Sequence, residues 1–212
     1  MAFATVPFSG SGPGGNIPAV GTGGGGSWTS TGGPTVLPND PFVSTISVPD
    51  DIKSVKSIEI SGLTHTWIGD VQAVLVSPDN IGHNIFVRPG LFNPGTFGNS
   101  GDFLGGDYTF VESGGSDLPT STTTAVNPPA GTYNQAFGVG AGMWPDGGFS
   151  IFNTPMGSIS GGGGDWTLVI YDWAVGDAGA LTGWTLNANL VPTPGAVVIF
   201  GLAGLAGLRR RR

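Results

Sequence analysis

The run from Val71 to Val76 constrains the fold more than any other part of the sequence, because it is apolar in both of its alternating sets of residues. One set is Val71, Ala73 and Leu75, and the other is Gln72, Val74 and Val76. Successive side chains of a strand point to opposite faces, so both faces of this strand must be covered by other parts of the chain. The run therefore predicts a strand inside a stack of sheets and not at its rim.

Two later stretches show the same period of two and predict neighbours for this strand. Trp166, Leu168 and Ile170 share one face of their stretch, and apolar residues alternate with polar ones from Trp184 to Leu190. We expect the central strands to be Val71–Ser77, Trp166–Tyr171 and Trp184–Leu190. Further strands are expected at Phe42–Val48, Val55–Ile60, Asn84–Arg88, Asp107–Glu112, Gly131–Tyr133 and Phe149–Phe152, with an exposed loop over residues 113–130.

The composition is typical of an all-β chain with one sizeable core. The 40 Gly and 17 Pro separate short strands, while six Trp and 12 Phe supply large apolar side chains. Together with the strand pattern, this predicts an all-β fold in which two antiparallel sheets pack as a β-sandwich.

Charge and cysteine content exclude several classes of function. The formal net charge is −7, and four of the seven basic residues are Arg209–Arg212. Without them the body carries three basic against 14 acidic residues, 3 − 14 = −11. Such a body repels phosphate backbones, so we expect no nucleic-acid partner, and it attracts cations such as calcium. The absence of cysteine excludes disulfides, thiolate zinc sites and a cysteine nucleophile.

Several motifs occur in the order found in a known family. They are His65–Asp70, Leu75–Pro78, Gly164–Leu168, Asp172, Asp177–Leu181 and Trp184–Leu186. These motifs resemble the P domain, or Homo B domain, which follows the catalytic domain in subtilisin/kexin-like proprotein convertases. The likeness covers residues 37–190 and is weaker over 90–148. It implies the jelly-roll form of the β-sandwich and a structural role for His65.

The N-terminal segment, residues 1–36, differs from this central part. It is rich in Gly, Ser, Pro and Thr, so we expect a flexible or poorly packed lead-in. Ala2-Phe3-Ala4 fits the small-x-small pattern that precedes signal cleavage. Our hypothesis is that a secretory signal lies upstream of the recorded start, and the alternative is a chance match.

Residues 191–212 form a third segment. It contains Pro192, Thr193 and Pro194, then an apolar stretch over 195–208, then Arg209, Arg210, Arg211 and Arg212. This order resembles the PEP-CTERM sorting signal of exopolysaccharide-producing bacteria, with Thr193 in place of the usual Glu. The resemblance implies an exported protein that is held transiently by a short membrane helix and cut by an exosortase-type enzyme at the cell envelope. A simple C-terminal membrane anchor is the alternative.

Few residues are candidates for a catalytic or metal-binding role. His65 and His83 are the two histidines of the chain, and none of the subtilisin-type catalytic signatures occurs. We expect His83 to be solvated and Asp70 to accept backbone N–H bonds from the turn before it. The alternative is a calcium site with oxygen ligands from Asp70, Asp165, Asp172 and Asp177.

These observations favour a protein with no catalytic residues and no enzyme activity. The first expectation is an exported β-sandwich with a structural or adhesive role at the cell envelope or in an exopolysaccharide matrix. One alternative is an accessory part of a subtilisin-like serine endopeptidase whose catalytic domain is encoded elsewhere. Another is a carbohydrate-binding jelly roll, in which exposed loop Trp side chains would stack on sugars.

Overall fold

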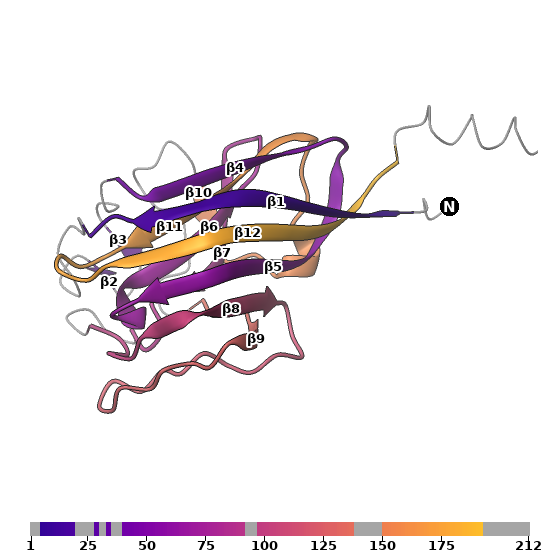
Figure 1. Cartoon of the computed structure of the whole chain (residues 1–212). Coiled ribbons are helices and arrows are strands. Elements are labelled where there is room, and N and C mark those ends of the chain that lie inside the picture. The colour runs from indigo at the N-terminus through magenta and orange to yellow at the C-terminus, as the bar shows by residue number, and fades with distance from the viewer. Residues whose placement is uncertain are drawn as a thin grey trace, which may run out of the picture.

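Two five-stranded sheets pack against each other in the computed structural model, which describes residues 5–19, 28–29, 33–34, 40–91, 97–137 and 150–192 (Figure 1). The front sheet has the order β1 (Val6–Ile17), β12 (Gly179–Leu190), β5 (Ile52–His65), β8 (Phe103–Val111) and β9 (Gly131–Asn134). The back sheet has the order β10 (Ser150–Phe152), β7 (Ile81–Val87), β6 (Val71–Val76), β11 (Gly164–Asp172) and β4 (Phe42–Val48). Smaller elements are the pair β2 (Trp28–Thr29) and β3 (Gly33–Pro34), and the 3-10 turns η2 (Ile68–Asp70) and η3 (Met156–Ser158).

The structure confirms the prediction of an all-β sandwich with β6, β11 and β12 inside the sheets. β6 lies in the middle of the back sheet and pairs with β11, and all six of its residues are buried. Its inner set packs in the main core between the sheets. Its outer apolar residues, Val74 and Val76, belong to a second buried cluster with Tyr171 and Trp173. A strand that is apolar on both faces therefore has apolar cover on both faces.

The prediction that both sheets are antiparallel throughout is wrong at two edges. β9 runs parallel to β8, and β10 runs parallel to β7. A parallel neighbour requires a connection long enough to return the chain to the end where the first strand began. Residues 112–130 provide this connection between β8 and β9, as a mostly exposed stretch that buries Leu118.

Residues 6–17 form a strand of the sandwich, within the segment 1–36 for which the sequence analysis expected a flexible or poorly packed lead-in. β1 pairs with β12 from Val6 opposite Leu190 to Ile17 opposite Gly179. Glycine is needed here for close packing, because a Cβ atom on Gly12 would lie 2.2 Å from the indole Nε1 of Trp184. The composition that suggests a linker is instead that of an edge strand lying over a buried tryptophan.

A buried hydrogen-bond chain also ties β1 into the fold. The Trp184 indole N–H donates to Ser44 Oγ at 2.8 Å, and the Ser44 hydroxyl donates to the carbonyl of Pro13 at 2.7 Å. These three residues come from β12, β4 and β1, so the chain joins the two sheets along one side of the sandwich.

Most of the predicted C-terminal segment lies outside the described residues, including Thr193, Pro194, the expected helix and Arg209–Arg212. Pro192 is described and follows β12 directly. Within the described part of the chain, none of the helices is both long and apolar enough to cross a membrane.

Candidate functional site

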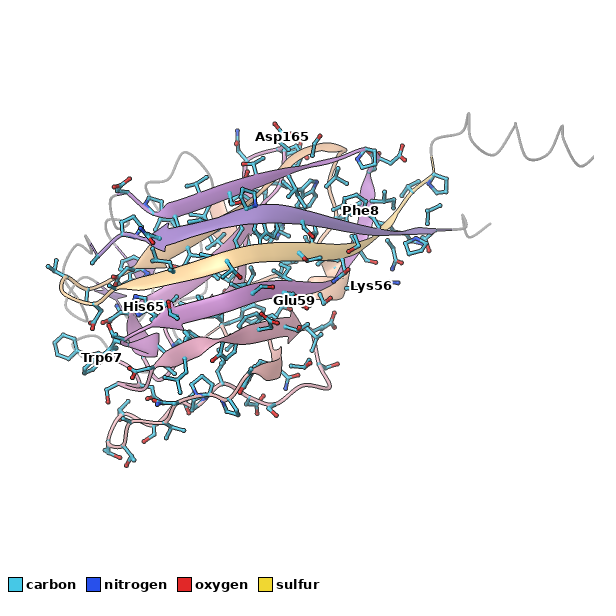
Figure 2. All side chains as sticks on the ribbon, viewed as in Figure 1. Phe8, Lys56, Glu59, His65, Trp67 and Asp165 are labelled. Carbon is cyan, nitrogen blue, oxygen red and sulfur yellow. The ribbon has the colours of Figure 1, made fainter. Side chains whose placement is uncertain are left out.

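Three of the motifs that carry the family resemblance, His65–Asp70, Asp172 and Asp177–Leu181, meet in one corner of the sandwich, where β5 ends, β6 begins and β11 ends. The His65 ring, at the end of β5, faces Asp172, at the end of β11, with 3.5 Å between His65 Nε2 and Asp172 Oδ2. Both side chains are buried. Since β5 belongs to the front sheet and β11 to the back sheet, this pair links the two sheets across their interior. Figure 2 labels His65 and Trp67 at this end of the molecule.

The backbone of Trp67 holds the His65 ring in place. The Trp67 N–H lies 3.1 Å from His65 Nδ1, and the Trp67 carbonyl lies 3.0 Å from the same atom. When Nδ1 accepts the Trp67 N–H, the proton of a neutral imidazole is on Nε2 and points toward Asp172. Asp172 Oδ1 also accepts the N–H of Ala174 at 3.1 Å. These contacts agree with the structural role that the resemblance implies for His65.

Asp70 pairs with a buried arginine. Arg88 Nη2 donates to Asp70 Oδ1 at 2.9 Å, and Arg88 Nε donates to the Gly69 carbonyl at 2.9 Å. The guanidinium also lies over the Trp173 ring, 5.6 Å from its centroid, as in a cation–π contact. The hydrogen bond found at the Asp70 carboxylate therefore comes from this guanidinium, where the sequence analysis expected N–H groups of the preceding turn.

Burial dominates the electrostatics of this pair. It raises the pKa of Asp70 to about 6, and the negative charge of Asp172 adds to the rise, while the Arg88 guanidinium opposes it. Burial likewise lowers the pKa of Arg88 from its usual value. Removing both charges from water costs free energy, and the close contact between the two side chains offsets this cost, as is typical of buried ion pairs.

A line of buried amides crosses the outer face of the back sheet. The Trp173 indole N–H donates to Gln72 Oε1 at 3.0 Å, Gln72 Nε2 donates to Asn84 Oδ1 at 2.8 Å, and Asn84 Nδ2 donates to Asn153 Oδ1 at 2.7 Å. This line satisfies polar groups that would otherwise be costly to bury. Trp173 directly follows the last residue of β11, and its indole is fully buried.

His83 is also buried, so the prediction that it is solvated is wrong. β7 begins at Ile81, before the predicted start at Asn84, and the His83 Nδ1 atom lies 3.0 Å from the hydroxyl of Thr154. Burial lowers the pKa of His83 to about 4.

This shift predicts a pH dependence of stability. The pKa of His83 in the folded protein is about 4, against an ordinary value of 6.5, so between these values the unfolded chain binds a proton more readily. The stabilising contribution of neutral His83 is present above pH 6.5 and is lost as the pH falls through 4. The variant His83→Asn, whose amide can still bond Thr154, should lose this dependence.

Urea unfolding of both proteins at pH 7, 5.5 and 4.5 checks the expectation. The Asp70 carboxyl acts in the opposite direction, because a raised folded pKa adds stability as the pH falls from about 6. It is present in both proteins, so it cancels in the comparison. Parallel curves for the two proteins would contradict the assignment to His83.

The four aspartates of the predicted calcium site do not come together. Asp70 and Asp172 lie in the corner, where the Asp177 carboxylate accepts the hydroxyl of Thr66 at 3.0 Å. Asp165 is exposed at the opposite end of β11, about 23 Å along the strand from Asp172. In the part of the chain that the structure describes, no group of three or more acidic or histidine side chains is placed to hold a metal ion.

Calcium binding stays a prediction with a direct measurement. A bound ion would stabilise the folded state by linkage, so millimolar calcium should raise the Tm above its value in chelator. Because Asp70 already has a guanidinium partner, Asp172 and Asp177 are the residues left to test, and Asp177→Asn should remove any such rise. An equal Tm in calcium and chelator would count against a site.

Comparison with known proteins adds distant structural similarity only. No protein-family model matches the chain, and no curated protein matches it. Among solved structures, the serine protease of Aeromonas sobria is similar at 14% identity over 87% of this chain, with a TM-score of 0.34. The same protease in complex with its chaperone gives 16% identity over 89% of this chain and a TM-score of 0.32. The match covers 28% of each of those chains.

Proposed function

We propose that the chain is a non-catalytic module of the P-domain type, a jelly-roll sandwich that acts by docking on a partner protein. The partner class that the resemblance favours is a serine endopeptidase whose catalytic domain is encoded separately. The observation that carries the proposal is that residues from three of the motifs, His65–Asp70, Asp172 and Asp177–Leu181, lie together in one corner. His65 and Asp172 come from motifs far apart in the sequence and meet across the two sheets, where they are buried and serve the fold.

Apolar side chains are exposed around the same corner. Phe97, Leu104 and Val175 are 57%, 66% and 71% exposed. The Phe97 carbonyl accepts the indole N–H of Trp67, and Leu104 lies opposite Thr64 on β5. Val175 is two residues from Asp177, which bonds Thr66. Exposed apolar side chains that gather around a rigid corner are typical of a protein-binding surface.

Binding to a partner catalytic domain tests the proposal. We would co-express the chain with subtilisin-like catalytic domains from the same host and measure co-purification and the Tm of the protease. Leu104→Glu and Val175→Glu should each weaken the complex by tenfold or more. Val43→Glu is the matched control, because Val43 is 57% exposed on β4 in the back sheet. Labelling of the purified chain by a serine-directed probe, lost on mutation of one serine, would overturn the proposal.

The sorting of the protein is a separate proposal that rests on the sequence of the C-terminal segment. We expect the segment after Pro192 to be removed in the native host, which would leave the sandwich at the cell surface. Intact-mass measurement of the mature protein checks this. A mature form that still contains Arg212 would exclude processing and favour a membrane anchor.

A further inference from the structure

The front sheet carries two copies of one small polar arrangement, side by side. On β5 the sequence Lys53-Ser54 is followed after Val55 by Lys56-Ser57, and on β12 the facing residues are Asn189 and Asn187. Asn189 Nδ2 donates to Ser54 Oγ at 3.0 Å, and Asn187 Nδ2 donates to Ser57 Oγ at 3.1 Å. Each copy is thus a lysine, a serine and an asparagine, which we call a Lys-Ser-Asn triplet.

Two β-bulges create this repetition. The register of β5 and β12 shifts between Asn187 and Ala188 and again between Asn189 and Leu190, so Lys56 and Lys53 are the extra residues of β5. A bulge opposes two residues to one and re-aims a side chain. Here each bulge leaves a lysine exposed beside a serine, while Val55 and Ile58 stay in the core. The triplets repeat every two residues of β12, about 7 Å.

The lysines are distinctive in this acidic chain. The described residues contain three Lys and Arg side chains, and Arg88 is fully buried, so Lys53 and Lys56 are the exposed cations of the described part. Neither forms an ion pair with a described residue. Two acids stand close to them in sequence and both have partners: the Asp51 carboxylate accepts the N–H of Gly163 at 3.0 Å, and the Glu59 carboxylate accepts the hydroxyl of Ser61 at 3.1 Å. Figure 2 shows Lys56 and Glu59 along β5 of the front sheet.

We propose that the two triplets form a binding surface for a linear acidic polysaccharide with carboxylate groups along its chain. The ammonium groups match carboxylates, and Ser and Asn can both donate to and accept from sugar hydroxyls. A repeated site suits a ligand that repeats, because two weak contacts on one chain add through effective concentration. The inference does not depend on the proposed docking function, because it concerns the open face of β5 and β12.

The same chemistry favours a polysaccharide over other polyanions. The triplets hold no aromatic side chain on which nucleic-acid bases could stack. They also lack the buried apolar anchor that dominates peptide recognition. The acidic remainder of the protein does not prevent local binding, because charges more than about 8 Å away are largely screened at physiological salt.

Titration calorimetry with polygalacturonate tests the proposal on the full chain. Loss of one exposed charged contact should weaken binding about fivefold, so Lys53→Gln and Lys56→Gln together should weaken it about 25-fold. Lys53→Arg with Lys56→Arg should retain binding. Val43→Glu with Thr45→Glu is the matched control: it changes the net charge by the same two units on β4, and it should change binding less than twofold.

Four further probes define the ligand class. Methyl-esterified polygalacturonate keeps the sugar backbone without the charge and should not bind. Polyglutamate, single-stranded DNA and phosphatidylglycerol vesicles should bind at least tenfold more weakly than polygalacturonate. Circular dichroism confirms that each variant is folded. The proposal is overturned when polygalacturonate does not bind, when the esterified polymer or another probe binds as tightly, or when the control variant loses as much affinity as the double lysine variant.

Discussion

Replacing Arg88 with Met should reduce the free energy of unfolding by about 3–5 kcal/mol, because it leaves the buried Asp70 carboxylate without its cation. Arg88 bonds both Asp70 and the Gly69 carbonyl, and its guanidinium lies over Trp173. Methionine keeps much of the side-chain length and supplies none of these polar contacts. Urea unfolding at pH 7, followed by tryptophan fluorescence and circular dichroism, measures the change.

A double variant separates the loss of the pair from the creation of an unpaired charge. Replacing a buried ion pair by apolar residues is often nearly neutral, whereas removal of one partner is costly. Asp70→Leu with Arg88→Met should therefore recover most of the stability that Arg88→Met loses. A double variant as unstable as the single one would show that the corner depends on the pair itself. A single variant as stable as the parent protein would contradict the role given to Arg88.

The corner also shows which part of the site could be predicted. His65, Asp70 and Asp172 stand in motifs that the sequence displays, so their importance could be recognised. Their partners could not, because Arg88 is joined to Asp70 through a strand end with a positive φ of 37° that no local pattern announces. Asp172 faces His65 only once the two sheets have packed. Pairing across sheets is a property of the tertiary fold, which strand periodicity does not contain.

The strands also differ in how far they could be predicted from the sequence. Buried strands such as β6 and β11 are recognisable because a covered face requires apolar residues at every second position. Lys53 and Lys56 interrupt that alternation in β5, so the sequence predicted only Val55–Ile60 where the strand runs from Ile52 to His65. β1 does not show this alternation of apolar residues. Glycine provides much of its contact with the core, as at Gly12 against Trp184, so few side chains are left to form a pattern.

Deleting residues 1–19 should prevent stable folding of the monomer. β1 covers one edge of β12 along almost its full length, and it contributes Ile17 to the main core with Phe8 packed against that core. Without β1, the Ser44 hydroxyl loses its Pro13 acceptor, and Trp184 loses the strand that covers it. A large buried aromatic that becomes exposed typically costs several kcal/mol, comparable to much of the stability of a small domain. Circular dichroism and size-exclusion chromatography of the deletion variant measure the effect.

A point substitution tests whether the loss of stability comes from the packing of β1 or from the shorter chain. Gly12→Ala places a methyl group against the Trp184 indole, so it should destabilise the protein by about 1–3 kcal/mol. Ser11→Ala is the matched control. Ser11 precedes Gly12 in β1 and is exposed, and its substitution removes only a hydrogen bond to the Thr185 hydroxyl. A synthetic peptide of residues 5–19 should restore native circular dichroism to the deletion variant. If the deletion variant folds as well as the full chain, β1 is dispensable and the glycine-rich N-terminus is a lead-in after all.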